Sequence, residues 1–505
     1  MSRSASKAMA TIAGISAVAL IMSACGSSDN GSGSSSQTPA GTTSAADTTS
    51  AAGPATSNAG NSGSPSSGSG QSGAPSSGGG SSSGPAVAGD DATWCDDIKK
   101  NWPDISGKKV TIYTSIVGAE LESMKKSWTD FKDCSGAEID ITGDKNFEQQ
   151  VLVKAKSGNP SDIAFVPQPG LLKSLVETGR AVEAPAQVAA NTDKYWDPGW
   201  KAYATVNGKF YGAPLGANVK SLVWYSPKMF AEKGYQVPQT WDDMIKLSDT
   251  IAGAGGAKPW CAGAESGNAT GWPLTDWLEE VMLRQAGPDA YDKWVSGELK
   301  FSSPEVTKAL DTVGSILKND KYVNAGWGDV SSIATTGFDK AGDPIQKSQC
   351  YMMQMANFYA SNWTGNPDIS ENGDIYAFYE PTMGDQFGKP VEVGGEFTLA
   401  FSNRPEVQAA QFYLSTAHWA NNQSKAASSR ISANKGLDPA NAQGPINKLS
   451  VQILQDPKTV SRFDASDLMP AAVGSGAEWQ QLTAWITGQD TASTLAAIDA
   501  AWPAS

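Results

Sequence analysis

The chain has 505 residues, long enough for two lobes with separate hydrophobic cores. Its formal net charge of -14 argues against partners such as nucleic acid or an anionic lipid surface. Only one His is present, so neither a His-based metal site nor a Ser-His-Asp triad is expected. His418 lies in a predicted helix, where we expect a structural role.

Residues 1–25 have the pattern of a targeting segment. Arg3 and Lys7 form a basic start, and the apolar stretch that follows is too short and too diluted for a transmembrane span. Small residues immediately before Cys25 resemble the lipobox of bacterial lipoproteins. This resemblance implies cleavage before Cys25 and its acylation, which would hold the protein on the extracytoplasmic face of the cell membrane through lipid alone. The alternative is an ordinary secretory signal with an incidental Cys.

Residues 26–92 are predicted to form a disordered tether. As far as residue 89 they are almost entirely Ser, Gly, Ala, Thr and Pro, with no aromatic residue. Such a segment buries too little apolar surface to offset the entropy lost on ordering. The expected r.m.s. span is roughly 45 Å, which would let the folded part sample the surrounding membrane surface.

Four more Cys residues lie in the folded part. An even number in an exported protein predicts two disulfides, and four Cys residues allow three pairings. We favour Cys95–Cys134, which would hold the start of the folded part to the end of its first long helix. The other bridge would be Cys261–Cys350, within one lobe. In the chain-entropy model each would contribute about 4 kcal/mol to stability, less any strain.

Residues 109–170 predict the first α/β elements. KVTIYT at 109–114 alternates as a strand, and apolar spacing predicts a helix over about 119–131. A strand at 139–141, a helix from 147, and an apolar strand at 163–166 then form a βαβ unit. Open parallel sheets bind ligands beyond the carboxyl ends of their strands. The polar residues expected there are Asp144, Asn146 and Gln168. Alternatively, these residues merely cap helices and turns.

Three motifs in this region resemble a known family. GDKNFE at 143–148, GNPSDIA at 158–164 and PQPG at 167–170 are similar to the extracellular solute-binding proteins of carbohydrate ABC transporters, most of all to the alpha-glucoside-binding branch. The resemblance continues in VNGKFYGAP at 206–214 and TGWPLTDW at 270–277. It implies a two-lobe α/β fold of the periplasmic-binding-protein type II, maltose-binding-protein-like, with a hinge and an interlobe cleft.

The same resemblance implies where the lobes divide. Lobe one would comprise residues 93–217 and 392–443, and lobe two would comprise residues 218–391 and 444–505. Residues 391–401 would carry the chain back from lobe two into lobe one.

Local signals predict several further elements. A helix is expected over 171–182 after the PQPG loop, and Asn207-Gly208 predicts a two-residue hairpin. Helix starts are predicted after Ser226, Thr240 and Ser303, whose side chains are good N-caps. Two elements follow later in the chain, a buried strand over 350–355 and a helix over 405–420.

The resemblance also implies which residues face a sugar. Trp272 would stack its indole on the apolar face of a pyranose, and Asp276 one turn later would accept hydroxyl hydrogens. Each of three residues also has a purely structural alternative. Trp272 could be packed in the core, Glu120 could be a carboxylate that stabilises the helix dipole, and Arg430 could lie on the surface. The predicted substrate-binding residues are Glu120, Asp144, Asn146, Gln168, Asn218, Trp272, Asp276, Tyr359, Trp363, Glu396, Arg430 and Trp479.

The predicted function is that of a membrane-anchored receptor that delivers an oligosaccharide, an alpha-glucoside, to the permease subunits of an ABC importer. It would act as a monomer, without cofactor, metal, catalysis or nucleic acid, and its lobes would close around the sugar. Two alternatives stay open. One is a secreted glycoside hydrolase, which needs two carboxylates about 5 to 9.5 Å apart. The other is the same fold binding an amino acid or a compatible solute.

Overall fold

The computed structural model describes residues 91–503 except 197, 325 and 428. The predicted signal peptide, Cys25 and residues 26–90 of the predicted tether lie outside the described residues, whereas residues 91 and 92 belong to the 3-10 helix η1 (Asp91–Thr93). Within the described part of the chain, every helix is too short or too polar to cross a membrane.

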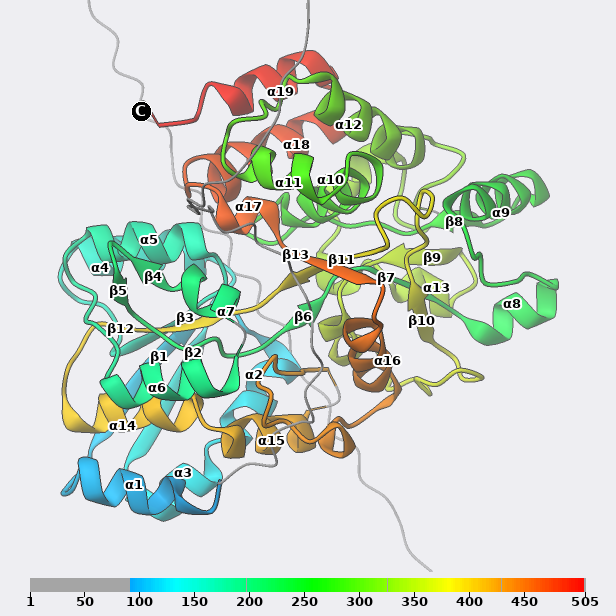
Figure 1. Ribbon diagram of the computed structural model, residues 1–505. Coiled ribbons are helices and arrows are strands. Elements are labelled where there is room, and N and C mark those ends of the chain that lie inside the picture. The colour runs from blue at the N-terminus through cyan, green and yellow to red at the C-terminus, as the bar shows by residue number, and fades with distance from the viewer. Residues whose placement is uncertain (1–90, 197, 325, 428, 504–505) are drawn as a thin grey trace, which may run out of the picture. The chain divides into compact units, whose positions relative to one another are not determined.

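The first lobe is built on a four-stranded sheet that contains the predicted βαβ unit (Figure 1). In spatial order its strands are β12 (Phe397–Ala400), β3 (Ile163–Val166), β1 (Lys109–Thr114) and β2 (Glu138–Gly143). β1 pairs in parallel with both β2 and β3, and β12 joins β3 in antiparallel. Helix α4 (Phe147–Lys156) connects β2 to β3, so the chain crosses β1 between them.

Both faces of this sheet are covered, because β1 and β3 alternate in the direction of their side chains. Ala164 and Val166 pack with apolar residues of α4 and α5 (Pro169–Glu177) on one face. Ile163 and Phe165 belong to a separate core on the other face, with residues of α3 (Thr129–Ser135) and α14 (Pro405–Leu414). The loops that follow β1, β2 and β3 therefore project from one edge of a covered sheet.

The second lobe has its own four-stranded sheet. Its spatial order is β10 (Tyr376–Tyr379), β7 (Leu222–Tyr225), β9 (Cys350–Gln354) and β8 (Lys258–Trp260). β7 and β9 are buried along their whole length, with Trp224 fully buried, as expected for strands covered on both faces. The predicted two-lobe α/β fold class is confirmed, and the predicted lobe boundaries remain a prediction.

A short third sheet joins the lobes. Its order is β13 (Thr459–Phe463), β11 (Lys389–Gly394) and β6 (Asn218–Val219). β6 leads into β7 of the second sheet, and β11 leads within two residues into β12 of the first. The backbone is closely packed here, because a Cβ at Gly395 would overlap the carbonyl oxygen of Gly216. We call the contact of Gly216 with Gly395 the crossing point.

Both predicted disulfides are present. Cys95–Cys134 joins α1 (Trp94–Asn101) to α3, with 5.8 Å between the Cα atoms. Cys261–Cys350 joins the residue after β8 to the start of β9, with the same Cα separation.

The turn and cap predictions are also confirmed. Asn207 and Gly208 have φ of 52 and 75° between β4 (Thr205–Val206) and β5 (Lys209–Phe210). The side chains of Ser226, Thr240 and Ser303 each accept a hydrogen bond from a backbone N–H of the helix that follows. The capped helices are α8 (Pro227–Lys233), α9 (Trp241–Ala254) and α12 (Pro304–Leu317).

Two of the predicted helices are each divided into two helices in the structure, because apolar spacing does not reveal a break in the backbone. Residues 119–131 form two helices, α2 (Gly118–Lys126) and then α3, and the Ser127 hydroxyl donates to the carbonyl of Met124 at the break. Residues 405–420 form α14 and α15 (Ala417–Ala426), because Thr416 is extended and caps the second helix. The apolar face continues across both breaks, which is why periodicity joined them.

The helix predicted over 171–182 is α5, which begins and ends earlier. Pro169 occupies the first turn, where no backbone donor is needed, and Gly179 with φ of 70° lies just beyond the end. The remaining long helices are α6 (Ala186–Tyr195), α10 (Trp272–Gln285), α11 (Pro288–Val295), α16 (Pro445–Gln455), α18 (Trp479–Ile486) and α19 (Thr491–Asp499). The remaining short elements are α7 (Pro198–Tyr203), α13 (Asp343–Gln346), α17 (Ala465–Leu468), η2 (Val330–Ala334), η3 (Phe338–Lys340), η4 (Asn357–Ser361), η5 (Pro439–Asn441) and η6 (Val473–Glu478).

Candidate functional site

A cavity of about 210 Å³ lies between the two lobes and is called the inner cavity below. Its first-lobe wall is formed by the loop after β1, the start of α2 and the loop after β3. Its second-lobe wall comes from the start of α10, from η3 and η4 and from the residues after β13. The predicted residues that line it are Glu120, Gln168, Asn218, Trp272, Glu396 and Trp479.

Three half-buried aromatic rings form one wall of the inner cavity. Trp272 lies with its ring centroid 5.2 Å from Phe338 and 6.1 Å from Phe358. Trp272 opens α10 directly after Gly271, which has φ of 115° and whose missing Cβ leaves room for the carbonyl of Trp479. The local Gly-Trp-Pro sequence thus presents an indole to the cavity, a surface suited to the C–H face of a sugar ring.

Polar atoms without partners point to a ligand in the same cavity. Among the described residues, Glu148 Oε2, Gln168 Oε1 and Trp479 Nε1 are buried and make no hydrogen bond, and all three side chains line the cavity. Gln168 Nε2 donates to the other oxygen of Glu148 at 3.4 Å. Burial raises the pKa of Glu148 to about 7. Buried groups of this kind are usually satisfied, so a polar ligand is expected to complete them.

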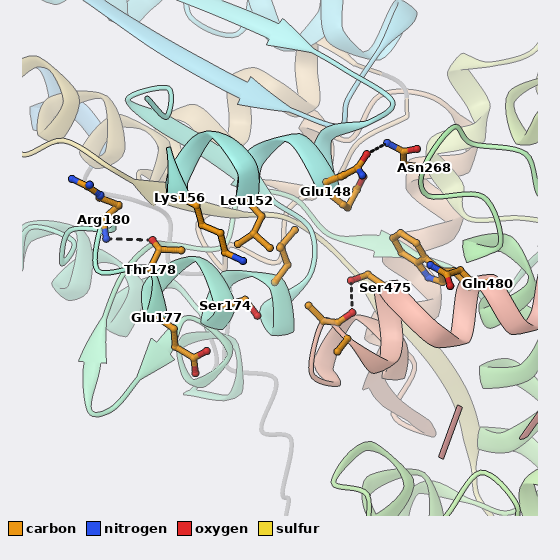
Figure 2. A pocket seen from close by; sticks show the side chains of 15 residues that line it. Glu148, Leu152, Lys156, Ser174, Glu177, Thr178, Arg180, Asn268, Ser475 and Gln480 are labelled. Atoms are coloured by element: carbon orange, nitrogen blue, oxygen red, sulfur yellow. Dashed lines mark hydrogen bonds between the residues drawn. The ribbon is translucent and has the colours of Figure 1, made fainter. Parts of the chain in front are cut away.

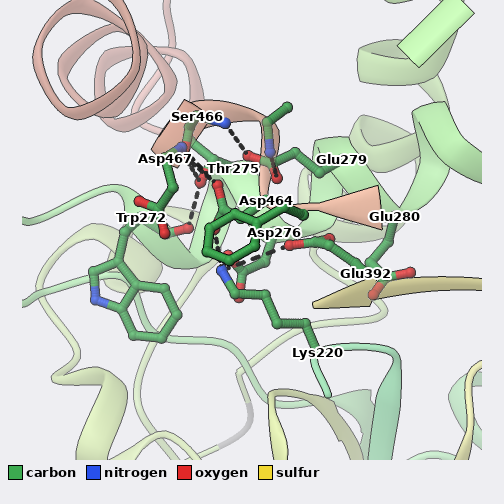
Figure 3. A network of polar contacts seen from close by, with 12 residues as sticks. Lys220, Trp272, Thr275, Asp276, Glu279, Glu280, Glu392, Asp464, Ser466 and Asp467 are labelled. Atoms are coloured by element: carbon green, nitrogen blue, oxygen red, sulfur yellow. Dashed lines mark hydrogen bonds and ion pairs between the residues drawn. The ribbon is translucent and has the colours of Figure 1, made fainter. Parts of the chain in front are cut away.

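A buried charge network lies beside this wall (Figure 3). Lys220 Nζ lies 2.7 Å from Asp276 and 3.5 Å from Glu392, and it also donates to Asp464. These three carboxylates have the spacing of a metal site, but the ammonium of Lys220 lies among them and supplies the positive charge. Burial alone would lower the pKa of Lys220, but the carboxylates outweigh it and hold that pKa well above its usual value.

The network places Asp276 behind the wall instead of on it. Asp276 is almost fully buried, is absent from the cavity lining and pairs with Lys220, and burial raises its pKa to about 7. Lys220 itself lines the cavity, with Nζ 5.7 Å from the ring centroid of Trp272.

Residues after β13 line the cavity, and the sequence reasoning missed them. Asp464 caps α17 by accepting from the backbone N–H of Asp467, and both residues line the cavity together with Ser466. Burial raises the pKa of Asp467 well above its usual range. These residues could have been found from the sequence, because they are polar and follow directly after the strand β13. The same rule, that ligands bind beyond the carboxyl ends of strands, was applied to β2 and β3.

Asp144 and Asn146 lie at the expected sheet edge but make protein contacts there. Asp144 accepts from the Tyr113 hydroxyl at 2.6 Å and from the backbone N–H of Asn146, and the first of these bonds lowers its pKa. Asn146 Oδ1 accepts from the backbone N–H of Asn268. Neither residue is part of the inner-cavity lining.

The aromatic side chains predicted after β9 lie in the core. Tyr359 is fully buried, its hydroxyl accepts from the backbone N–H of Gly342, and both it and Trp363 pack against Trp224. The residue that reaches the inner cavity is the preceding one, Phe358. The 3-10 turn of η4 sets which side chain faces outward, and the sequence pattern did not reveal it.

Arg430 also lies behind the cavity wall. It is nearly fully buried, donates to Glu120 and Glu396, and is absent from the lining. Both of its partners line the cavity.

A second, wider space of about 820 Å³, the outer groove, opens between α4 and α5 on one side and residues 471–480 on the other (Figure 2). It shares Glu148 and Trp479 with the inner cavity. The outer groove is the larger space, but the aromatic wall and six of the twelve predicted residues belong to the inner cavity, which we therefore take as the candidate binding site.

The sequence is similar to a family of bacterial binding proteins and to two relatives over most of its length. Residues 117–410 match the family model of the bacterial extracellular solute-binding proteins. The osmoprotective compounds-binding protein GgtB of Synechocystis sp. is 33% identical over 408 residues, covering 79% of this chain and 95% of that protein. The alpha-glucosides-binding periplasmic protein AglE of Rhizobium meliloti is 31% identical over 434 residues, covering 81% and 92%.

Solved structures of similar fold include the bacterial solute receptor AcbH, with a TM-score of 0.66 at 19% identity over 78% of this chain and 97% of that one. Maltose-bound MalE3 of T. maritima has a TM-score of 0.62 at 18% identity, covering 78% and 98%. At these identities the likeness shows the two-lobe fold.

Proposed function

This chain belongs to the bacterial extracellular solute-binding proteins, and from that premise we propose that it binds an alpha-glucoside oligosaccharide and delivers it to the permease subunits of an ABC importer. The family and the relatives above support the coarser role, a substrate-binding protein of a sugar importer. The finer choice of alpha-glucoside is supported by the name of AglE and by the chemistry of the inner cavity.

The observation that carries the proposal is the pairing of an aromatic wall with unsatisfied polar atoms. Trp272, Phe338 and Phe358 offer ring faces to the C–H side of a pyranose. Glu148 and Gln168 lie in the same cavity with buried oxygens that accept no hydrogen bond from the described residues. Sugar hydroxyls would satisfy such atoms, and a wrong epimer would leave one unmatched, at a cost of about 1–3 kcal/mol.

The proposal includes the location and state of the protein. Acylated Cys25 anchors the chain to the outer face of the cell membrane, residues 26–90 act as its tether, and the receptor works as a monomer. Residues 93–217 with 392–443, and 218–391 with 444–505, are the two lobes that close on the sugar. No sugar is cleaved, in keeping with a family whose members are binding proteins.

A second candidate keeps the fold and changes the ligand to a compatible solute. It is favoured by the relative GgtB, whose name describes binding of osmoprotective compounds, at an identity similar to that of AglE. Both candidates use the same inner cavity, so only the identity of the bound ligand distinguishes the two proposed functions.

The test is titration calorimetry of the purified protein against alpha-linked di- and trisaccharides, amino acids and betaines, with reducing-sugar release assayed in the same samples. We expect saturable binding of an intact alpha-glucoside with an affinity near micromolar, about -8 kcal/mol. Binding of only a betaine or another osmolyte would replace the proposed ligand with the second candidate. Release of reducing sugar would show a hydrolase instead.

A further inference from the structure

Two carboxylates on the wall of the inner cavity share one buried guanidinium. Arg430 donates from Nη1 to Glu120, in α2 of the first lobe, and from Nη2 to Glu396 at 2.5 Å. Glu120 and Glu396 line the inner cavity, whereas Arg430 is only 1% exposed and lies behind them. A planar guanidinium suits this arrangement, because its fork can hold two carboxylates in fixed directions at once.

The segment that carries Arg430 is itself fixed by the crossing region. The carbonyl of Arg430 accepts from Asn447 Nδ2 at 2.9 Å, and the next residue, Ile431, pairs with Ala217. Gly216 lies over the ion pair, where a Cβ would come within 2.5 Å of Arg430 Nη2. The guanidinium therefore has little freedom to leave its two partners.

We infer that Arg430 is a positioning residue for ligand recognition: it fixes the orientation of Glu120 and Glu396, so that each offers its second oxygen to a ligand hydroxyl. Among the described residues, neither Glu120 Oε2 nor Glu396 Oε1 accepts a hydrogen bond. The inference rests on the proposed sugar-binding function and assigns to Arg430 no contact with the sugar.

The electrostatics of the cluster give the inference a distinctive signature. The pKa of Glu120 lies above its usual value, because burial raises it more than the neighbouring Arg430 lowers it, and Glu396 raises it further. Without the guanidinium, two carboxylates would remain together in a buried wall, where like charges cannot easily both be ionised. One of them would then hold a proton at a higher pH than before and would stop accepting a hydroxyl hydrogen.

The chain offers a matched control. Arg284 is equally buried and also pairs with two buried carboxylates, Glu280 and Glu380, but none of these residues lines the inner cavity. Arg284→Met should therefore cost folding stability as Arg430→Met does, without altering the groups that touch ligand.

The experiment measures, from pH 5.5 to 8.5, the dissociation constant of an alpha-linked disaccharide, with maltose and trehalose as probes, for the unaltered protein, Arg430→Met, Arg430→Lys and Arg284→Met. The readout is the ratio of each variant's constant to that of the unaltered protein, so that titrations common to both cancel. For Arg430→Met we expect about tenfold or greater weakening at pH 6 that shrinks as the pH rises and the carboxylates ionise. The ratio for Arg430→Lys should lie between one and the ratio for Arg430→Met. The ratio for Arg284→Met should stay constant with pH.

A ratio for Arg430→Met that does not change with pH would overturn the inference, because a purely structural loss weakens binding equally at every pH. A second readout needs no ligand: carboxyl carbon NMR of Glu120 should show a higher titration midpoint in Arg430→Lys and Arg430→Met than in the unaltered protein. An unchanged midpoint would also overturn it. If the unaltered protein binds no sugar, the proposed function fails while this titration still decides the role of Arg430.

Discussion

Asn146 and Asn268 meet across the interlobe cleft: the backbone N–H of Asn268 donates to Asn146 Oδ1 at 3.3 Å. The side chain of Asn268 also donates to Gln149, and next to Asn146, Lys145 lies 3.5 Å from Asp339. Asn146, Gln149 and Lys145 belong to the first lobe, whereas Asn268 lies in the loop before α10 and Asp339 lies in η3. These contacts join the two sides of the inner cavity, and Lys145 and Asp339 are part of its lining.

Asn268→Ala should therefore speed ligand release more than it slows ligand entry. The substitution removes the side-chain bond to Gln149, and the loss of one such bond predicts about three- to tenfold faster dissociation. Stopped-flow dissociation of bound sugar measures this rate. Asn101→Ala, which changes an exposed Asn on α1, is the control and should leave the rate unchanged. Equal release rates for the two variants would contradict a closing role for these contacts.

Trp272→Ala should weaken sugar binding by roughly ten- to a hundredfold, since it removes the indole face on which the sugar stacks. Trp272→Phe should keep part of the affinity because one ring remains. Calorimetry of both variants provides the measurement. Trp327→Ala is the control, because Trp327 is 37% exposed and is not part of the cavity lining. Retention of full affinity by Trp272→Ala would exclude stacking on this residue.

Glu380→Gln should stabilise the protein at alkaline pH. Glu380 is fully buried, and burial raises its pKa from 4.5 to about 8, although Arg284 lowers it. A carboxyl whose pKa is raised in the folded state gives stability that is complete below pH 4.5 and is lost as the pH rises through 8. The glutamine resembles the protonated acid and does not suffer that loss, which is on the order of a few kcal/mol.

Thermal unfolding at pH 5 and pH 8.5 tests this prediction. The midpoint of Glu380→Gln should exceed that of the unaltered protein at pH 8.5, and the difference should nearly vanish at pH 5. Glu298→Gln changes an exposed carboxylate and should show no such dependence. A constant difference between the two pH values would mean that Glu380 is ionised in the folded protein throughout this range.

Lys220→Met should destabilise the protein strongly, by about 3–5 kcal/mol, because it leaves Asp276, Glu392 and Asp464 buried without their cation. Adding Asp464→Asn should restore part of the loss, since one uncompensated charge is removed. Urea unfolding of the single and double variants measures the coupling. Lys228→Met, at an exposed ion pair with Asp374, is the control and should have little effect. Additive losses in the double variant would argue against one shared network.

Much of the fold followed from local sequence patterns. The apolar alternation of β1, the continuous apolar run of β3, the Asn207-Gly208 turn and the three side-chain N-caps each depend on residues close in sequence. The breaks at Ser127 and Thr416 were missed, because both lie within a continuous apolar face.

The site was harder to predict, since it depends on contacts between distant segments. Trp272 and Glu120 follow strand or turn signals and reach the inner cavity as expected. Asp276 lies behind the wall because Lys220, 56 positions earlier, reaches it from the link between β6 and β7. No periodicity in the sequence predicts a buried lysine that pairs with carboxylates from three separate segments. The same holds for Arg430, whose two partners are 310 and 34 positions away.

The glycines at the crossing point restrict how the lobes can move. A Cβ at Gly395 would overlap the carbonyl oxygen of Gly216, and a Cβ at Gly216 would meet the guanidinium of Arg430, so neither position has room for a side chain. Close backbone contact of this kind favours lobe motion by rotation of the main chain at the crossing point over sliding of packed side chains. An Ala at either position would force the neighbouring atoms apart and would change the preferred angle between the lobes, even though Gly and Ala are both small and uncharged.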